Sequence, residues 1–269
     1  MCKPLENHIR KVIEQAEKEF AIKVLYACES GSRAWGFPSK DSDYDVRFIY
    51  IHHPNWYLSI DQKRDVIEIP NHDPISIPVD PLLDMSGWEL TKTLKLFRKS
   101  NPPLLEWLRS NMIYYQRFST IEKMKQLEKQ IFSPTSTIYH YLNMAKGNFR
   151  EYLQGDTVKI KKYFYVLRPI LAAKWVQTFQ TIPPMEFDIL VHRLIPDGAL
   201  RTKIDILLER KKSGEELTLE PRINLINEYL EREMQQLETY AKGLERNLID
   251  PTEQLDQLFR YTLKEVWND

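Results

Sequence analysis

This chain has few cysteines and no long hydrophobic run, and both shortages exclude classes of protein. Cys2 and Cys28 are the only cysteines among 269 residues, and Cys2 lies at the extreme N-terminus, where disulfide pairing is unusual. A reducing, intracellular setting is the simpler interpretation. No apolar run approaches the roughly 18 to 20 residues of a membrane span, and the opening MCKPLENHIRK is too polar for a secretory signal. We therefore expect a cytoplasmic protein with no membrane partner.

An excess of charge of one sign is also missing. Lys plus Arg number 38 and Asp plus Glu number 38, so the formal net charge is zero. This balance does not require a nucleic acid or an anionic membrane as partner, although a local basic patch is compatible with it. The contents of 42% hydrophobic and 12% aromatic residues are those of a folded chain. A length of 269 residues suits two ordinary domains.

Hydrophobic periodicity predicts a mixed N-terminal part over about residues 1–115. The spacing of apolar residues predicts a helix over 5–20, because they recur three and four positions apart. The segment 43–51 alternates, with Tyr44, Val46, Phe48 and Tyr50 on one face and Asp43, Asp45 and Arg47 on the other. Further strands are expected over 22–27, 64–69 and 75–79.

From about residue 86 to the C-terminus the pattern is helical. Asn101 and Pro102 are suited to begin one helix, and Ser133 with Pro134 to begin another. Two more amphipathic helices are expected over 223–244 and 251–267. An all-helical domain over 116–269 is thus expected to follow the mixed part.

Two of the 8 glycines lie in the stretch CESGSRAWGFPSKDSDYDV, just ahead of two aspartates. Residues two apart in a strand share a face, so Asp43 and Asp45 point the same way a few ångströms apart. Such carboxylates repel each other unless a cation neutralises them. Hard oxygen ligands on a rigid strand suit Mg²⁺, which fills its other positions with water and substrate phosphate.

The pair Gly31 and Ser32 has the composition of a phosphate-binding turn. It follows a predicted strand and is expected to open a short helix through Trp35. A glycine there lets backbone N–H groups approach a phosphate, and the serine hydroxyl adds a donor. By itself each element also has an ordinary structural explanation, as a turn glycine or a solvated strand edge.

Together the two elements resemble a known signature. Gly31-Ser32, ten residues, and Asp43-Tyr44-Asp45-Val46 resemble the motif of the DNA-polymerase-β-like nucleotidyltransferase superfamily. With SGWELTKTLKLFRKSNPPLLEWLRS and a following MIYY, the first 170 residues are similar to predicted nucleotidyltransferases of the YcgL type, which are related to the RNA-ligase-associated group.

The resemblance implies an α+β fold, with a small mixed β-sheet nucleotidyltransferase domain and helices at 1–115 and a helical C-terminal domain. It implies two-metal nucleotidyl transfer with Mg²⁺ or Mn²⁺ and an NTP as substrate, releasing pyrophosphate. Gly31, Ser32, Arg33 and Ser42 are then expected at the nucleotide and Asp43 and Asp45 at the metal.

The resemblance also implies a third carboxylate, as ligand of the second metal or as general base. Asp84 is favoured because only Met85 separates it from the SGWEL segment, at an expected strand-to-helix junction. Glu68 has the better strand context, between two isoleucines, and Asp80 is a third candidate. A solvated carboxylate in a turn is the alternative for each of the three. We expect Asp84 to act in catalysis and to bind metal.

Cations next to aromatic rings occur in the segment KIKKYFYVLRP of the helical part. At helical spacing Lys161, Tyr165 and Arg168 share a face, which suits a base and a triphosphate. We expect Lys162 and Arg168 to contact the nucleotide across a cleft. A charged helix face with inward tyrosines explains the segment equally well.

The sequence thus predicts transfer of a nucleoside monophosphate from an NTP to an acceptor hydroxyl. It does not identify the acceptor, which can be RNA, a protein or a small molecule, although the neutral net charge makes long RNA less attractive. The alternatives are a non-catalytic nucleotide- or RNA-binding protein and an antitoxin-like interaction protein that keeps the fold.

Overall fold

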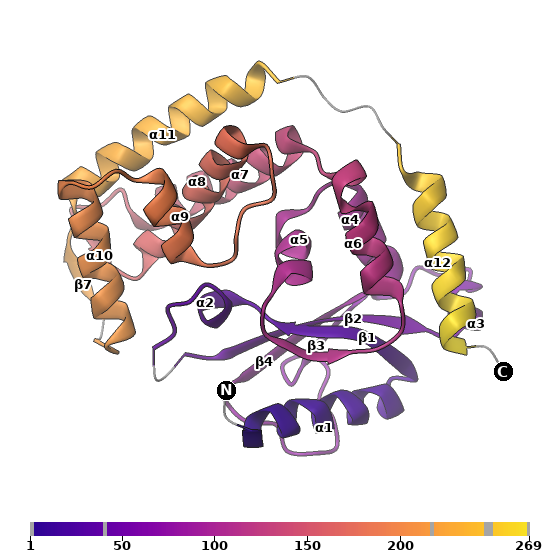
Figure 1. Ribbon diagram of the computed structural model, residues 1–269. Coiled ribbons are helices and arrows are strands. Elements are labelled where there is room, and N and C mark those ends of the chain that lie inside the picture. The colour runs from indigo at the N-terminus through magenta and orange to yellow at the C-terminus, as the bar shows by residue number, and fades with distance from the viewer. Residues whose placement is uncertain (1–2, 40–41, 216–217, 245–249, 268–269) are drawn as a thin grey trace.

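A mixed five-stranded sheet forms the centre of the N-terminal part in the computed structural model, which describes residues 3–39, 42–215, 218–244 and 250–267 (Figure 1). The strand order is β3-β4-β2-β1-β5, with β2 and β4 parallel and the other neighbours antiparallel. The strands are β1 (Ile22–Glu29), β2 (Tyr44–His52), β3 (Val66–Ile69), β4 (Leu83–Glu89) and β5 (Ile113–Gln116). Strand β2 is central and pairs with β1 and β4, so its side chains have neighbours on both sides.

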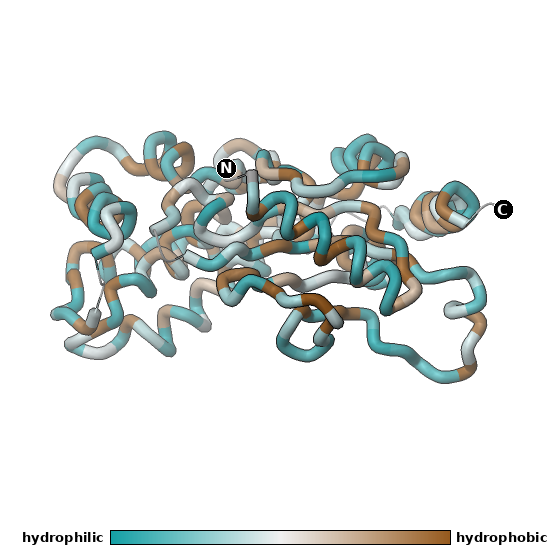
Figure 2. The backbone as a smooth tube through the Cα atoms, turned by 90° about the horizontal axis from the view of Figure 1, so that it is seen from below, coloured by the Kyte–Doolittle hydropathy of each residue, from teal (hydrophilic) through white to brown (hydrophobic). Residues whose placement is uncertain are grey.

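Helix α1 (Lys3–Glu19) covers one face of the sheet. Its apolar stripe Ile9, Val12, Ile13 and Ala16 is almost fully buried, as the sequence spacing predicts. It packs in one core with Val46, Phe48 and Tyr50 of β2, the predicted apolar face of that strand. Figure 2, seen from the α1 side, shows the helix lying across the sheet with hydrophilic residues along its length.

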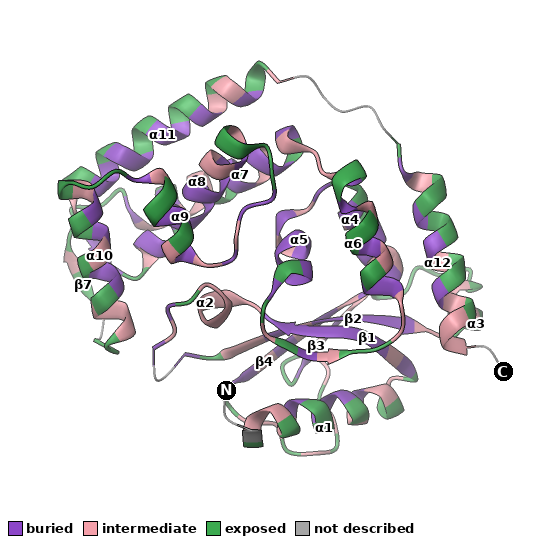
Figure 3. Cartoon of the chain, in the orientation of Figure 1, coloured by how far each residue is buried: buried purple, intermediate pink, exposed green. Residues whose placement is uncertain are grey.

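Four helices cover the opposite face of the sheet: α4 (Leu90–Arg98), α5 (Pro102–Arg109), α6 (Thr120–Ile131) and α12 (Thr252–Trp267). Asn101 caps α5 as predicted, because its side chain accepts from Leu104 N at 3.2 Å and Pro102 begins the helix. The C-terminal helix α12 packs against α4 and α6 with Leu255 and Leu258 buried. Figure 3 shows these helices turning their buried sides toward one another.

The remaining helices form a separate core. They are α7 (Pro134–Tyr152), α8 (Lys162–Phe179), α9 (Phe187–Leu194), α10 (Ala199–Lys212) and α11 (Asn224–Lys242). Ser133 caps α7 as expected, and α11 and α12 match the last two predicted helices. Short helices α2 (Gly31–Ala34) and α3 (Pro54–Tyr57) complete the helical elements of the described residues, and β6 (Thr157–Lys159) with β7 (Leu219–Pro221) forms a small two-stranded sheet.

Two expectations about secondary structure were wrong. Residues 75–79 form no strand, because Pro78 removes a backbone donor in their midst, although Ile75, Ile77 and Val79 still pack on the α1-side core. Residues 86–89 were expected to start a helix and instead continue β4, where they pair with both β2 and β3. Two sheet partners outweigh a local helical spacing, since pairing with strands on both sides provides hydrogen-bond partners for the backbone.

A buried ion pair joins the two parts of the chain. Arg168 of α8 donates to Glu106 of α5 at 2.8 Å, and its guanidinium lies 4.4 Å from the Trp35 ring centre. Tyr141 of α7 also donates to Glu106, at 2.5 Å. Phe37, from the N-terminal part, belongs to the core of the helical part. The expected domain boundary at residue 115 stays a prediction, and α6 and α12 pack on the sheet side of it.

Among the described residues, no helix has the length and apolarity needed to cross a membrane. Cys28 is buried in β1 as a free thiol, and Cys2 lies outside the described residues.

We predict that Arg168→Ala destabilises the protein by about 3 kcal/mol or more, because Glu106 is then left as a buried charge without its partner. Urea unfolding measures the change. Lys161→Ala, an exposed neighbour at the start of α8, is the matched control and is expected to cost less than about 0.5 kcal/mol. Equal effects of the two changes would show that the ion pair does not stabilise the junction.

Candidate active site

The two aspartates of the opening motif lie at the start of β2. The strand begins at Tyr44, so Asp43 immediately precedes it and Asp45 is its second residue. Both line a cavity of about 400 Å³ between the N-terminal part and the helical part. The lining residues are Ser30, Gly31, Ser32, Trp35, Phe37, Ser39, Ser42, Asp43, Asp45, Arg47, Lys161, Phe164, Tyr165 and Lys211.

Gly31 lies directly against the Asp45 carboxylate. Its φ is +60°, and a Cβ built at this position would lie 1.9 Å from Asp45 Oδ2. The neighbouring Ser30 N–H donates to the Asp45 carbonyl at 2.8 Å, which fixes the loop to the strand. Glycine is therefore needed here both for its backbone conformation and for the space that the carboxylate occupies.

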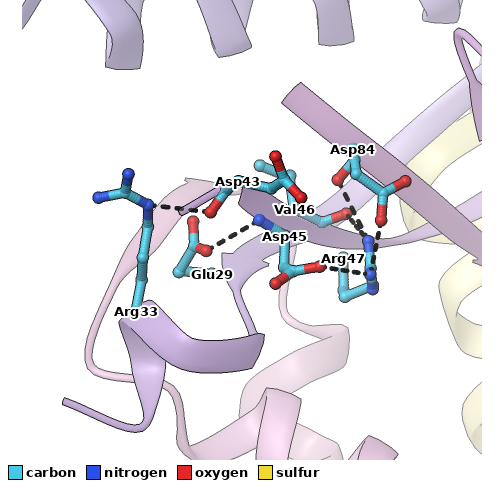
Figure 4. A network of polar contacts seen from close by, with 7 residues as sticks. All are labelled: Glu29, Arg33, Asp43, Asp45, Val46, Arg47 and Asp84. Carbon is cyan, nitrogen blue, oxygen red and sulfur yellow. Dashed lines mark hydrogen bonds and ion pairs between the residues drawn. The ribbon is translucent and has the colours of Figure 1, made fainter. Parts of the chain in front are cut away.

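Arg47 joins Asp45 to the favoured third carboxylate, Asp84 (Figure 4). Its Nη2 donates to Asp45 Oδ1 and to Asp84 Oδ2, each at 2.9 Å. Its Nη1 donates to the backbone carbonyls of Val46 and Asp84, each at 3.1 Å. The guanidinium thus holds the two strands and their carboxylates together.

Sheet register explains why Asp84, rather than Glu68, reaches this cluster. Asp84 is directly opposite Asp45 in the parallel pair of β2 and β4. Glu68 lies on β3, one strand farther from β2, where it is opposite Ser86 of β4. Its carboxylate contacts Arg64 at 3.1 Å and His72 at 3.1 Å. Asp80 precedes β4 and caps the turn by accepting from Leu82 N. The roles of all three carboxylates stay predictions, and only Asp84 lies beside Asp45.

Glu29, the last residue of β1, is a site residue that sequence reasoning missed. It is fully buried and accepts from Asp45 N at 2.9 Å and from Tyr114 Oη at 2.5 Å. Burial raises its pKa to about 7, against the opposing effect of these hydrogen bonds. Burial also raises the pKa of Asp45, an effect that Arg47 opposes and that Asp84 and Asp43 reinforce. The sequence does contain a signal for Glu29: it is an acidic residue in the segment CESG, directly after a predicted strand that is mostly apolar.

Hydrogen bonds to backbone oxygens shape the loop before β2. Arg33 donates to the carbonyls of Ser42 at 2.6 Å and Asp43 at 3.0 Å, and its guanidinium lies 3.6 Å from the Tyr44 ring centre. The Ser39 and Ser42 hydroxyls share a hydrogen bond of 2.9 Å. Of the expected nucleotide contacts in this part, Gly31, Ser32 and Ser42 line the cavity, whereas Arg33 supports the loop behind it.

Helices α8 and α10 form the other wall of the cavity. Lys161, Phe164 and Tyr165 come from the start of α8, and Lys211 of α10 donates to Ser39 Oγ at 2.9 Å. Lys161 and Tyr165 belong to the helix face that the sequence suggested for the nucleotide, whereas Lys211 was not singled out from the sequence.

The structure does not bring Lys162 and Arg168 to this wall. Lys162 Nζ lies over the rings of Tyr152 and Tyr165, at 3.9 and 4.8 Å from their centres. Arg168, the seventh residue of α8, lies on the same helix face as Lys161 and Tyr165 but farther along the helix, where this face packs on α5 and Arg168 is buried in the ion pair with Glu106. Their proposed nucleotide contacts stay a prediction that this geometry does not support.

The donor atoms of the cavity suit one hard divalent cation. Asp43 and Asp45 contribute carboxylate oxygens to the lining of the cavity, and the turn of Gly31 and Ser32 lies beside them. Among the described residues, no cluster of three or more His, Cys, Asp or Glu side chains has the arrangement of a metal site. The expected coordination by Asp43, Asp45 and Asp84 together stays a prediction, since Arg47 occupies the space between the last two.

Comparisons with known proteins match nearly the whole chain. The profile of the RlaP family, described as the RNA repair pathway DNA polymerase beta family, matches residues 5–261. A Bacillus subtilis (strain 168) protein named "Uncharacterized protein YcgL" is 51% identical over 265 residues, which cover 98% of this chain and 99% of that protein.

A crystal structure of a nucleotidyltransferase-like protein from Exiguobacterium sibiricum 255-15 was also matched, with a TM-score of 0.30 and 10% identity. The match covers 98% of this chain and 81% of the other. A similarity this weak carries no argument about this chain.

We predict that Gly31→Ala displaces the Asp45 carboxylate and weakens binding of divalent cations about tenfold or more, because the new Cβ takes the place of Oδ2. Gly36→Ala is the matched control, since Gly36 has a φ of +85° with nothing within 4 Å of its Cβ position. Both changes are expected to cost about 1 kcal/mol of backbone strain. Denaturation and Mn²⁺ titration of the two variants test this. Equal loss of cation binding in both would rule out the contact with Asp45 as the cause.

Proposed function

The chain belongs to the RlaP family, the RNA repair pathway DNA polymerase beta family. We propose that it transfers a nucleoside monophosphate from an NTP to an acceptor hydroxyl. The proposal is supported mainly by the arrangement of Gly31 and the two aspartates. The Gly31 turn packs on Asp45 in a cavity that Asp43 and Ser32 also line, so a phosphate-binding turn and two carboxylates meet in one place. These are the parts required to hold a metal–nucleotide complex.

The cavity offers a separate contact for each part of an NTP. Ser32 and Ser42 supply hydroxyl donors near the Gly31 turn, and Lys161 and Lys211 supply positive charge on the opposite wall. Tyr165, which is 46% exposed, offers an aromatic surface at the cavity for the base. Mg²⁺ bound by Asp43 and Asp45 would neutralise phosphate charge and help the pyrophosphate to leave.

The reaction is a substitution at the α-phosphorus atom. A bond forms between the acceptor oxygen and this phosphorus, and the bond from phosphorus to the bridging oxygen of pyrophosphate breaks. The proton of the acceptor hydroxyl passes to a carboxylate. Asp84, the candidate from the sequence, lies next to Asp45 on the neighbouring strand but outside the lining of the cavity, so it would act as this base for an acceptor hydroxyl that approaches from the Asp84 side. The chain contributes mainly positioning and charge stabilisation.

For the acceptor we propose the hydroxyl of an RNA end. The description of the family as part of an RNA repair pathway supports this choice over a protein or a small molecule. A cytoplasmic location belongs to the same proposal, since NTP and RNA are both present there.

The proposal is tested by incubating the purified protein with Mg²⁺ and each labelled NTP, with RNA oligonucleotides, proteins of a cell extract, or small molecules as acceptors. We predict pyrophosphate release and label on RNA, and loss of both in Asp43→Asn and Asp45→Asn. Asp61→Asn, at an exposed carboxylate away from the site, is the control and is expected to keep full activity. NTP binding without pyrophosphate release under any condition would favour the non-catalytic alternative.

We predict that Lys161→Ala weakens NTP binding by ~1.5 to 3 kcal/mol, the contribution of a hydrogen bond to a charged group. Lys162→Ala is expected to weaken it by less than about 0.5 kcal/mol, because Lys162 lies on two tyrosine rings instead of lining the cavity. Calorimetric NTP titrations at moderate salt separate the two. The reverse order would favour the nucleotide contact that the sequence suggests for Lys162.

A further inference from the structure

The Arg47 guanidinium occupies the space between Asp45 and Asp84, the pair of carboxylates that would have to share a second metal ion. One nitrogen, Nη2, donates to both carboxylates at 2.9 Å, and the other, Nη1, donates to two backbone carbonyls of β2 and β4 at 3.1 Å. The site therefore already has a cation at this point, built into the protein and held by four acceptors.

The charge of this cation is permanent. An arginine side chain keeps its proton in proteins, and its several N–H groups allow it to donate to two carboxylates and two carbonyls at once. The side chain is 19% exposed, so water screens it little. A divalent ion bound to Asp45 and Asp84 would lie within a few ångströms of the guanidinium and be repelled by it. It would also compete with it for the same oxygen atoms.

The two oxygens of Asp45 have different surroundings. Oδ1 accepts from Arg47, whereas Oδ2 lies beside the Gly31 turn, where a Cβ would come within 1.9 Å of it. Asp43 and Asp45 line the cavity, and Asp84 does not. The atoms available to a metal are thus on the cavity side of Asp45, and the atoms held by Arg47 are on the Asp84 side.

From this arrangement we propose that Arg47 takes the place of a second metal ion, so that the chain binds a single divalent cation, at Asp43 and Asp45. Asp84 is then held by an arginine and is not a metal ligand. The inference rests on the proposed function, because it concerns the metal content of the same site, and it replaces the two-metal scheme expected from the sequence.

Counting bound Mn²⁺ by electron paramagnetic resonance tests the proposal without measuring turnover. The full chain is titrated with Mn²⁺ in the presence of one equivalent of a non-hydrolysable NTP analogue. We expect one ion per chain. Arg47→Met should admit a second ion, because it frees the oxygens of Asp45 and Asp84, and the double change Arg47→Met with Asp84→Asn should return the count to one. Arg47→Lys keeps a positive charge and should stay at one.

If Arg47→Met does not fold, Asp84→Asn alone tests whether Asp84 is a metal ligand. It should change the Mn²⁺ affinity of the otherwise unaltered chain by less than about twofold, whereas Asp45→Asn should lower it at least tenfold. Two ions in the unaltered chain, a tenfold loss of affinity in Asp84→Asn, or a count of one in folded Arg47→Met would each overturn the proposal.

The metal count tests this inference and the transfer assay tests the proposed function, so either can be contradicted without the other. A chain that transfers nucleotide with two bound ions keeps the proposed function and loses this inference. A chain that binds one ion at Asp45 and transfers nothing keeps the single cation site and loses the proposed function. A chain that binds no Mn²⁺ with the analogue loses both.

Discussion

Repulsion between carboxylates is the constraint on which the rest of the site depends. Asp45 and Asp84 are directly opposite each other on parallel strands, with Asp43 one residue before β2 and Glu29 buried behind. Four acidic groups in one corner of a sheet are unfavourable unless cations and donors compensate for them. Arg47 forms an ion pair with two of them and offsets one of their negative charges, and backbone and tyrosine donors hydrogen-bond to Glu29. These contacts compensate for the repulsion and leave the corner with a net negative charge, on which the proposed cation site depends.

The same corner determines how the helical part is attached. Gly31 lies against Asp45, and the residues that follow it up to Ser39 contact helices α8, α9 and α10. Phe187 N donates to the Trp35 carbonyl at 2.9 Å, and Lys211 donates to Ser39. The buried pair of Arg168 and Glu106 lies just behind Trp35. The width of the cavity therefore depends on contacts made by both parts of the chain.

Sequence patterns predicted the elements that bury one clear face. The stripe of α1, the alternation of β2, the Asn101 and Ser133 caps and the last two helices all follow from local spacing, and the structure contains them. The α+β class and the family were predicted correctly as well. The features that were predicted wrongly or left open depend on contacts between segments far apart in the sequence. Whether 86–89 becomes strand or helix depends on pairing with β2 and β3. Whether Arg168 faces a cavity or a core depends on where α5 brings Glu106. No pattern within one segment contains that information.

Helix α12 packs on the same side of the sheet as α4, α5 and α6, although it comes last in the chain. Helices α6 and α12 cover the same apolar surface, yet α7 to α11 lie between them in the sequence. Residues of α6 and of α12 thus pack in one core with the sheet, although the five helices between them belong to another core. A fragment ending near residue 115 would expose Leu94 and Phe97 to water and lose two of its covering helices. A stable fragment of the sheet part would therefore need α6 and α12 as well as the five strands.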